Sequence, residues 1–237
     1  MRSMPRNDPL QYDELADQWW QPGGGFEMLH WLAEARAALI PRAGRAGAVL
    51  VDAGCGGGLM APHVAGKGYR HIGVDLGRTG LRLAASHGVQ PVNGDVTALP
   101  LASGTADVVA AGEILEHVTD LPGTVAELSR VLRPGGLVVI DTVNDNALSR
   151  FITITAGEWL GLAPPGIHDA SLFVRPSRLI AEFARHGVRL TVRGARPTLG
   201  GVVRWRLHRR PTRGRIVPTG LTAVLYQGTG RKEGERS

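Results

Sequence analysis

One acid and three glycines near position 50 are the residues whose types and spacing first suggest chemistry. The apolar run 49–51 ends at Asp52, and Gly54, Gly56 and Gly58 complete the pattern D-x-G-x-G-x-G. Glycines in a turn after a buried strand let the backbone approach a ligand, because no Cβ stands in the way. An acid before the glycines repels a pyrophosphate but attracts an ammonium or sulfonium group, which favours S-adenosylmethionine over a dinucleotide. The alternative is an ordinary glycine-rich turn.

Two further acids end the next two candidate strands. Asp75 follows the run 71–74, at the distance beyond the glycine motif where an acid binds ribose hydroxyls in Rossmann-like folds. Asp95 ends the run 92–94. Because the carboxyl ends of parallel strands meet at one edge of a sheet, acids after three successive strands predict one ligand lying across that edge. Each acid taken alone could instead cap a helix.

A block of two glutamates and a histidine follows the fourth candidate strand. Glu113, Glu116 and His117 lie on one face if Glu113 begins a helical turn, and such a set suits Mg²⁺, Mn²⁺ or Zn²⁺. A phenolic methyl acceptor has a pKa near 10, so its proton must be removed or polarised. A bound metal would do this, or His117 would act as the general base. The alternative is a local hydrogen bond of His117 without any metal.

Apolar runs alternate with helical patterns along the body of the chain, which predicts an α/β fold with a doubly wound parallel sheet. The predicted parallel strands lie at 48–52, 71–75, 90–93, 107–111 and 137–141. The predicted helices lie at 57–66, 78–87, 121–131 and 176–186. Two later runs, 188–192 and 221–226, are expected as the antiparallel edge strands of a seven-stranded sheet.

Segments outside this alternation are expected to cover the ligand. Residues 1–43 should form an N-terminal helical cap, in which Trp19 and Trp20 either line the cleft or pack in the core. The partly apolar segment 144–172 is long for a connection, which is typical of a functional lid or substrate wall. The ligand-binding domain is therefore expected over 44–227, with a disordered tail at 228–237.

Several further motifs resemble those of a known family. The stretches 99–101, 106–109 and 132–136 are similar to core segments of the class I S-adenosylmethionine-dependent methyltransferases. The resemblance is strongest to the ubiquinone-biosynthesis O-methyltransferases, the 3-demethylubiquinol 3-O-methyltransferase family, and covers most of residues 10–185. It is carried by Tyr12-Asp13-Glu14-Leu15-Ala16 with Trp19-Trp20 and Leu29-His30, by the E-x-x-E-H block at 113–117, by Gly166-Ile167-His168-Asp169, and by Phe173-Val174-Arg175-Pro176. The tail beyond about residue 190 matches poorly.

The resemblance implies a Rossmann-like methyltransferase that binds S-adenosylmethionine. By position, Asp52 would lie near the methionine ammonium, Asp75 would bind the ribose, and Asp95 with the Val96 amide would bind the adenine. Gly54 and Gly56 would leave room for the cofactor. Arg36 matches an arginine that contacts the methionine carboxylate, although a lone helical arginine is more often a surface residue.

The same resemblance implies O-methylation of a catechol-like or hydroquinone hydroxyl, with Glu113 and His117 as catalytic residues. The family carries a metal at the block, so Glu113, Glu116 and His117 would hold it, as Mg²⁺ or Zn²⁺. His168 and Asp169 would add an acid–base or metal pair on the acceptor side, or a hydrogen bond that fixes the loop. The poorly matching tail puts recognition of a polyprenyl chain in doubt.

Composition bounds the remaining interpretations. The net charge of +6 is concentrated at 204–215, where Arg204-Trp205-Arg206-Leu207 alternates like a strand with one basic face. Such a patch suits peripheral contact with anionic lipid at the inner membrane face, or it is a solvated hairpin. Aromatic residues are too sparse there to stack nucleic-acid bases. The single cysteine, Cys55, and the absence of a secretory signal favour a cytoplasmic protein.

Three other functions compete with an O-methyltransferase that acts on a small aromatic acceptor. The first keeps the cofactor but methylates carbon or nitrogen of a small molecule without a metal. The second is a non-catalytic protein that binds lipid surfaces. The third, a nicotinamide-dependent oxidoreductase, is disfavoured by Asp52 and by the missing G-x-G-x-x-G spacing.

Overall fold

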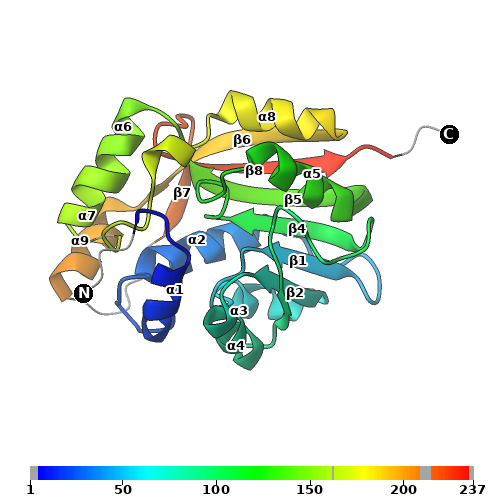
Figure 1. The fold of residues 1–237 in the computed structure, drawn as a ribbon, viewed down its shortest axis with the longest axis horizontal. Helices are drawn as coiled ribbons and strands as arrows, with labels where there is room; N and C mark the ends of the chain where they lie inside the picture. The colour runs from blue at the N-terminus through cyan, green and yellow to red at the C-terminus, as the bar shows by residue number, and fades with distance from the viewer. Residues whose placement is uncertain (1–4, 162, 209–214, 235–237) are drawn as a thin grey trace.

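A twisted, mostly parallel β-sheet forms the centre of the molecule, as the computed structural model shows for residues 5–161, 163–208 and 215–234 (Figure 1). Across the sheet the strands are β3 (Gln90–Asn93), β2 (Arg70–Asp75), β1 (Val49–Ala53), β4 (Ala106–Gly112), β5 (Leu132–Val143), β8 (Leu225–Lys232), β6 (Val188–Pro197) and β7 (Ile216–Thr219). Strands β1 to β5 pair in parallel, whereas β8 pairs antiparallel with β5 and β6. The predicted α/β fold is confirmed, with eight strands in the described residues rather than seven because β7 extends the edge.

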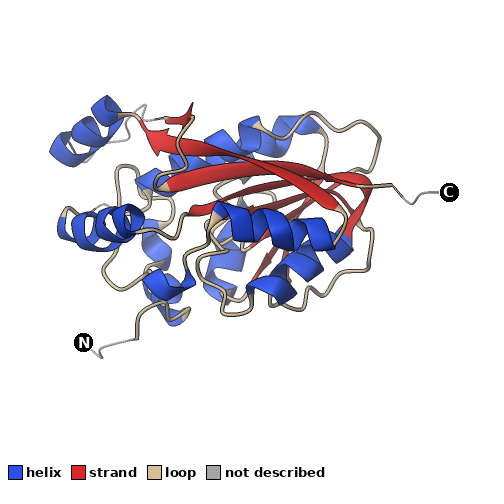
Figure 2. Cartoon of the chain, turned by 90° about the horizontal axis from the view of Figure 1, so that it is seen from above, coloured by secondary structure: helices blue, strands red, loops and turns tan. Residues whose placement is uncertain are grey.

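Helices cover both faces of this sheet (Figure 2). One face carries α2 (Glu27–Ala38), α3 (Ala61–Val64), η2 (Ala65–Lys67) and α4 (Arg78–Ser86), and the other carries α5 (Leu121–Val131) and α8 (Pro176–Arg185). Neighbouring strand residues point to opposite faces, so the two cores divide by alternation. Val49 and Val51 join the cluster beneath α5 and α8, whereas Leu50 joins the cluster beneath α2 and α3. Strands buried on both faces explain the continuous apolar runs in the sequence.

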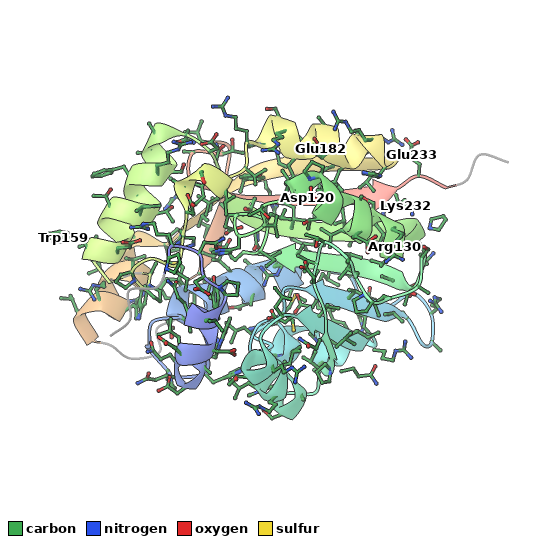
Figure 3. The ribbon with its side chains drawn as sticks, in the orientation of Figure 1. Asp120, Arg130, Trp159, Glu182, Lys232 and Glu233 are labelled. Atoms are coloured by element: carbon green, nitrogen blue, oxygen red, sulfur yellow. The ribbon has the colours of Figure 1, made fainter. Side chains whose placement is uncertain are left out.

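The N-terminal cap and the segment between β5 and α8 lie outside the two helical layers. The cap contains α1 (Leu10–Glu14) and η1 (Ala16–Gln18), and the second segment contains α6 (Ala147–Arg150), the π-turn η3 (Phe151–Ala156), α7 (Gly157–Trp159) and η4 (Ala170–Leu172). Trp159 is 85% exposed and projects from the edge of the molecule (Figure 3). Over the described ranges, no helix is both long enough and apolar enough to cross a membrane.

The predicted basic strand at 204–207 is wrong, because these residues belong to helix α9 (Leu199–His208). The alternation was misleading because one tryptophan in the stretch is a buried anchor. The Trp205 side chain is 3% exposed, meets Trp31 edge to face at 5.9 Å, and donates from Nε1 to the Gly23 carbonyl at 3.0 Å. Leu207, expected on an apolar strand face, is 72% exposed. Arg209, Arg210 and Arg213 of the basic stretch lie outside the described residues.

The predicted tail also begins too early. Residues 228–232 form the second half of β8, hydrogen-bonded to β5 and β6, whereas 235–237 lie outside the described residues. Glycine permits close packing here, because a Cβ on Gly230 would meet the Arg189 carbonyl at 2.7 Å. At the end of β8, Lys232 donates to the carbonyls of Ser129 and Leu132 and so caps α5 (Figure 3).

Two phenylalanines of opposite exposure test this division into core and surface. Phe183 of α8 is fully buried, whereas Phe151 is 59% exposed. Phe183→Ala should lower the free energy of unfolding by about 3–5 kcal/mol, because it leaves a cavity in the core. Phe151→Ala should change it by less than about 0.5 kcal/mol. Urea unfolding of both variants checks this, and similar losses would contradict the described burial.

Candidate functional site

A cavity of about 780 Å³ opens at the carboxyl edge of the parallel strands. The chain leaves β1 toward β2 and β3, and later continues from β4 toward β5 on the other side of β1. At such a reversal the two crossovers diverge, which leaves room for a ligand beside the strand ends. The cap supplies Trp19 and Tyr12 as a second wall, and α9 supplies Val202.

All the residues predicted to bind the cofactor contribute to the lining of this one cavity. They are Arg36, Asp52, Gly54, Gly56, Asp75, Asp95 and Val96. The Asp75 carboxylate accepts hydrogen bonds from the backbone N–H groups of Gly56 and Gly77, both at 2.8 Å. Burial raises the pKa of Asp75, and these two hydrogen bonds oppose the rise. One acid thus fixes the glycine turn and faces the cavity.

The other two acids have different surroundings. Asp52 is 3% exposed, and its Oδ2 lies 3.4 Å from Nε2 of the buried His71. Asp95 accepts from both the backbone N–H and the hydroxyl of Thr97 at 2.8 Å, which orders the turn after β3. Asp52 therefore places buried negative charge at the β1 end of the cavity.

The tryptophans of the cap separate into two environments. Trp19 lines the cavity and stacks on Phe26 at 4.7 Å. Its ring lies on Gly56, where the backbone has φ +50° and any side chain would clash with the indole. Trp20 is absent from the described cavity lining, because it stacks on His87 at 3.7 Å and donates to the Gly57 carbonyl. The space that Gly56 leaves free is thus partly filled by the Trp19 ring of the cap.

Arg36 is buried rather than a surface residue, and it pairs with Asp141 at the end of β5. Its Nη1 lies 2.5 Å from the Asp141 carboxylate, and its Nε has no partner among the described residues. Burial opposes the charge on Arg36, but Asp141 and then Asp52 raise its pKa. The predicted contact with a methionine carboxylate would have to use the remaining guanidinium N–H groups. The sequence signal that could have found Asp141 is the familiar one, an acid that ends an apolar run.

The block after β4 is a turn and does not form the helical turn expected from its spacing. Glu113 has φ +53°, and the chain then folds through a bond from the His117 N–H to the Ile114 carbonyl. The carboxyls of Glu113 and Glu116 are neighbours, and Oε1 of each is buried without a partner among the described residues. Burial and the Glu116 charge raise the pKa of Glu113 well above its usual range, and burial raises the pKa of Glu116 to about 7. The pair therefore holds a proton near neutral pH.

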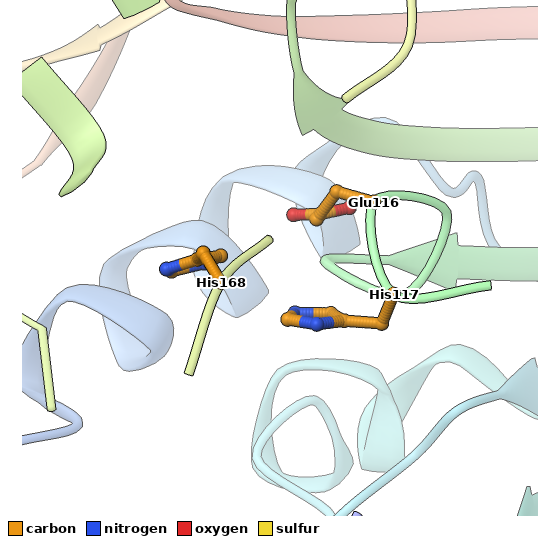
Figure 4. Close-up of side chains that lie close together, drawn as sticks. All are labelled: Glu116, His117 and His168. Atoms are coloured by element: carbon orange, nitrogen blue, oxygen red, sulfur yellow. The ribbon is translucent and has the colours of Figure 1, made fainter. Parts of the chain in front are cut away.

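Three side chains converge beside this turn, and Glu113 is not one of them. One potential ligand atom each from Glu116, His117 and His168 lies within 4.8 Å of the others (Figure 4). Glu116 and His117 come from the turn after β4, whereas His168 comes from the separate segment that precedes η4. The rings of His117 and His168 stack at 5.2 Å. Glu116 Oε1 and His168 Nδ1 are buried without a partner among the described residues.

The two histidines are neutral at physiological pH. Burial and then the neighbouring His168 lower the pKa of His117 to about 3, and burial lowers the pKa of His168 to about 4. The ring of His117 is also bonded on both sides, to Asn7 and to Tyr12. A histidine with so low a pKa is a weak general base but a competent metal ligand.

Asp169, expected beside His168 in the site, instead caps the short helix η4. Its Oδ1 accepts from the backbone N–H and the hydroxyl of Ser171 at 2.8 and 2.7 Å. Of the two roles expected for His168 and Asp169, the hydrogen bond that fixes the loop applies to Asp169. His168 lies in the cluster with Glu116 and His117. Asn7 and Tyr12 were not expected at the site, since no local pattern connects the first residues of the chain with His117.

Comparisons with known proteins find methyltransferases that are similar in sequence and in fold. The family model described as a methyltransferase domain matches residues 51–140. A ubiquinone biosynthesis O-methyltransferase of Cupriavidus pinatubonensis is 38% identical over 77% of this chain and 78% of its own length. The enzyme of the same name from Thiobacillus denitrificans is 37% identical over 78% of this chain and 83% of its own length. A Thermotoga maritima S-adenosylmethionine-dependent methyltransferase structure aligns with a TM-score of 0.66 at 17% identity, covering 94% of this chain and 97% of that one.

The pKa of Glu116 predicts a pH dependence of stability. Because the folded-state pKa of about 7 exceeds the ordinary 4.5, the folded protein keeps a proton that the unfolded chain loses between these values. Stability should therefore fall as pH rises from 4.5 to 7, and Glu116→Gln should reduce that fall. Urea unfolding across this range measures it.

A matched glutamate should behave in the opposite sense. Bonds to Arg130 lower the pKa of Glu127, so its charged form stabilises the protein above pH 4.5 and that contribution is lost as pH falls. Glu127→Gln should be less stable than wild type above pH 4.5 and should approach wild type in acid. Parallel pH curves for wild type and Glu116→Gln would contradict the raised pKa.

Proposed function

The chain belongs to the ubiquinone biosynthesis O-methyltransferase family and is an S-adenosylmethionine-dependent methyltransferase, and we propose that it methylates a phenolic hydroxyl with the help of a divalent metal. The proposed acceptor is a catechol-like or hydroquinone ring. The observation that carries this proposal is the convergence of Glu116, His117 and His168, of which the two histidines line the same cavity as Asp52 and Asp75. A site for activating a hydroxyl and a site for a cationic methyl donor thus share one space.

The donor set fits a metal. Glu116 Oε1 and His168 Nδ1 are buried and unpartnered in the described structure, which is costly for polar atoms unless a ligand satisfies them. Two imidazoles and one carboxylate favour Zn²⁺ over Mg²⁺, since Mg²⁺ prefers oxygen ligands. Three protein ligands leave a coordination position open, as catalytic zinc sites require. When bound, such a metal would act as a Lewis acid that lowers the pKa of an acceptor hydroxyl.

Neighbouring residues hold the proposed ligands in place. The Thr142 hydroxyl donates to Glu116 Oε2 at 2.6 Å, which leaves Oε1 toward the cluster. Among the described residues Glu113 does not belong to the converging set, and burial beside Glu116 raises the pKa of its carboxyl well above the usual range. We therefore assign Glu113 to positioning Glu116, in place of the ligand and catalytic roles expected from sequence.

Polar and apolar residues line different parts of the cavity, which suits a charged cofactor on one side and an aromatic acceptor on the other. The strand-end acids would bind the cationic cofactor, with Asp52 near the ammonium and Asp75 at the ribose. The α2 side and the lid side supply apolar walls from Met28, Leu32 and Ile167, which suit an aromatic acceptor. Methyl transfer is an in-line displacement, so holding acceptor oxygen and methyl carbon together away from bulk water is the main task of these walls.

We further propose that the cavity mouth contacts an anionic membrane surface. The apolar rim is defined as Leu148, Phe151, Trp159, Leu199, Val203 and Leu207, all of which are more than half exposed. Arg204 and Arg206 lie on α9 within this rim, and neither pairs with a carboxylate in the described part of the chain. Exposed apolar and unpaired basic side chains together suit the interface of an anionic bilayer.

Removal of one proposed ligand tests the metal-assisted reaction. His168→Ala should weaken Zn²⁺ binding to metal-stripped protein and lower turnover of catechol by about 100-fold or more, because it removes a donor from a three-donor set. Cofactor affinity measured by calorimetry should stay within about twofold. His186→Ala, outside the cavity lining, is the matched control. Full turnover by His168→Ala in the presence of a chelator would favour a metal-free carbon, nitrogen or oxygen methyltransferase.

Substitutions in the apolar rim test the membrane contact. The double change Phe151→Ser with Trp159→Ser should reduce sedimentation with vesicles of phosphatidylglycerol and phosphatidylcholine, because it removes the most exposed aromatic area. Binding of S-adenosylmethionine should be unaffected. Raising the salt concentration should also weaken wild-type binding, since the basic contribution is screened. Equal binding to neutral and anionic vesicles would contradict the role given to Arg204 and Arg206.

A further inference from the structure

Asn7, near the start of the chain, makes two contacts with His117, one to its backbone carbonyl and one to its ring. We propose that Asn7 is a positioning residue for the methyl transfer, which fixes the tautomer of His117 so that the lone pair is on Nε2. This inference rests on the proposed function only for its consequence in the reaction. The tautomer itself follows from hydrogen bonds that the structure shows.

The amide of Asn7 meets two different atoms of the same histidine. Its Nδ2 donates to the backbone carbonyl of His117 at 2.9 Å, and its Oδ1 lies 2.5 Å from Nδ1 of the His117 ring. A backbone carbonyl can only accept, so the NH₂ end of the amide must face it. The amide oxygen then faces Nδ1, and because that oxygen can only accept, Nδ1 must carry the proton.

The opposite ring nitrogen is therefore the one with a free lone pair. The Tyr12 hydroxyl lies 3.1 Å from Nε2, and since a neutral imidazole protonated on Nδ1 can only accept there, the hydroxyl must donate. Tyr12 thus occupies the position on Nε2 that a metal ion or an acceptor hydroxyl would take.

The bond at Nδ1 is the kind of outer contact that orients metal-binding histidines. A ligand histidine usually donates its second N–H to a carbonyl, carboxylate or similar acceptor, which fixes the ring and its tautomer. Here the acceptor comes from a residue 110 positions away in the sequence. Without it, the ring could also adopt the tautomer protonated on Nε2, which has no lone pair on that nitrogen.

The short segment at Arg6 and Asn7 also holds the other histidine. Arg6 Nη1 donates to the His168 carbonyl at 2.9 Å and pairs with Glu158 at 2.7 Å. The Asn7 N–H donates to the Gly166 carbonyl at 2.9 Å. Both candidate ligand histidines are thus tied to adjacent residues of the cap, although they come from segments that follow different strands.

The backbone of Asn7 determines which substitutions are informative. Its φ of +61° lies in the left-handed region, which asparagine, aspartate and glycine tolerate better than other residues. Asn7→Gly removes the amide without straining the backbone. Asn7→Asp keeps an acceptor for the Nδ1 proton but loses the donor to the His117 carbonyl. Asp8→Ala is the matched control, because Asp8 bonds only locally, to the Leu10 N–H.

The test uses full-length protein labelled with ¹⁵N-histidine. Ring ¹⁵N shifts should show His117 protonated on Nδ1 in wild type, Asn7→Asp and Asp8→Ala, and a substantial population protonated on Nε2 in Asn7→Gly. Assignment of the signal comes from His117→Gln. Zn²⁺ affinity and turnover of catechol should fall about tenfold in Asn7→Gly, with the KM for S-adenosylmethionine unchanged.

Three outcomes separate the two proposals. An Nε2-protonated His117 in wild type, or an unchanged tautomer in Asn7→Gly, would overturn the role of Asn7. Wild-type protein that binds no Zn²⁺ would refute the metal site of the proposed function, while the ring shifts would still decide on Asn7. A changed tautomer with lower Zn²⁺ affinity and unchanged folding, measured by urea unfolding, supports the inference.

Discussion

The crowding of carboxyl groups at one edge of the sheet is the constraint on which the rest of this structure depends. Five acids, Asp52, Asp75, Glu113, Glu116 and Asp141, lie close to the carboxyl ends of β1, β2, β4 and β5. Taking carboxylates out of water is expensive unless charge or hydrogen bonds compensate them. Arg36 neutralises Asp141, backbone N–H groups bind Asp75, and burial raises the pKa of Glu113 and of Glu116. What remains is negative charge directed into the cavity, which a sulfonium and an ammonium complement.

The N-terminal cap completes the site and is more than a cover for it. Trp19 lies on the glycine turn, Tyr12 bonds to His117, and Asn7 fixes the same ring. Trp19 and Tyr12 thus take positions where a ligand group could bind, and Asn7 orients a ring that a ligand would contact.

The C-terminal part of the chain shows how one buried side chain overrides a local pattern. The alternation of arginine with apolar residues at 204–207 is typical of a strand, yet burial of Trp205 against Trp31 fixes a helix beside α2. That helix brings Val202 into the cavity wall and leaves Leu199, Val203 and Leu207 facing outward. The region where the sequence resembles the family least thus contributes to the cavity wall.

The sequence by itself determined the α/β class, the positions of the parallel strands and the acids that end them, because each of these signals is local. A buried strand must be apolar, a tight turn needs glycine, and both leave a mark within ten residues. Only the tertiary structure decided which donors meet. The left-handed backbone at Glu113 prevents the expected helical turn, and the segment 144–172 brings His168 to Glu116 and His117. Asn7 meets His117 from 110 positions away in the sequence. Contacts between segments so far apart depend on how the cap packs on the sheet, and no short pattern of residues records that packing.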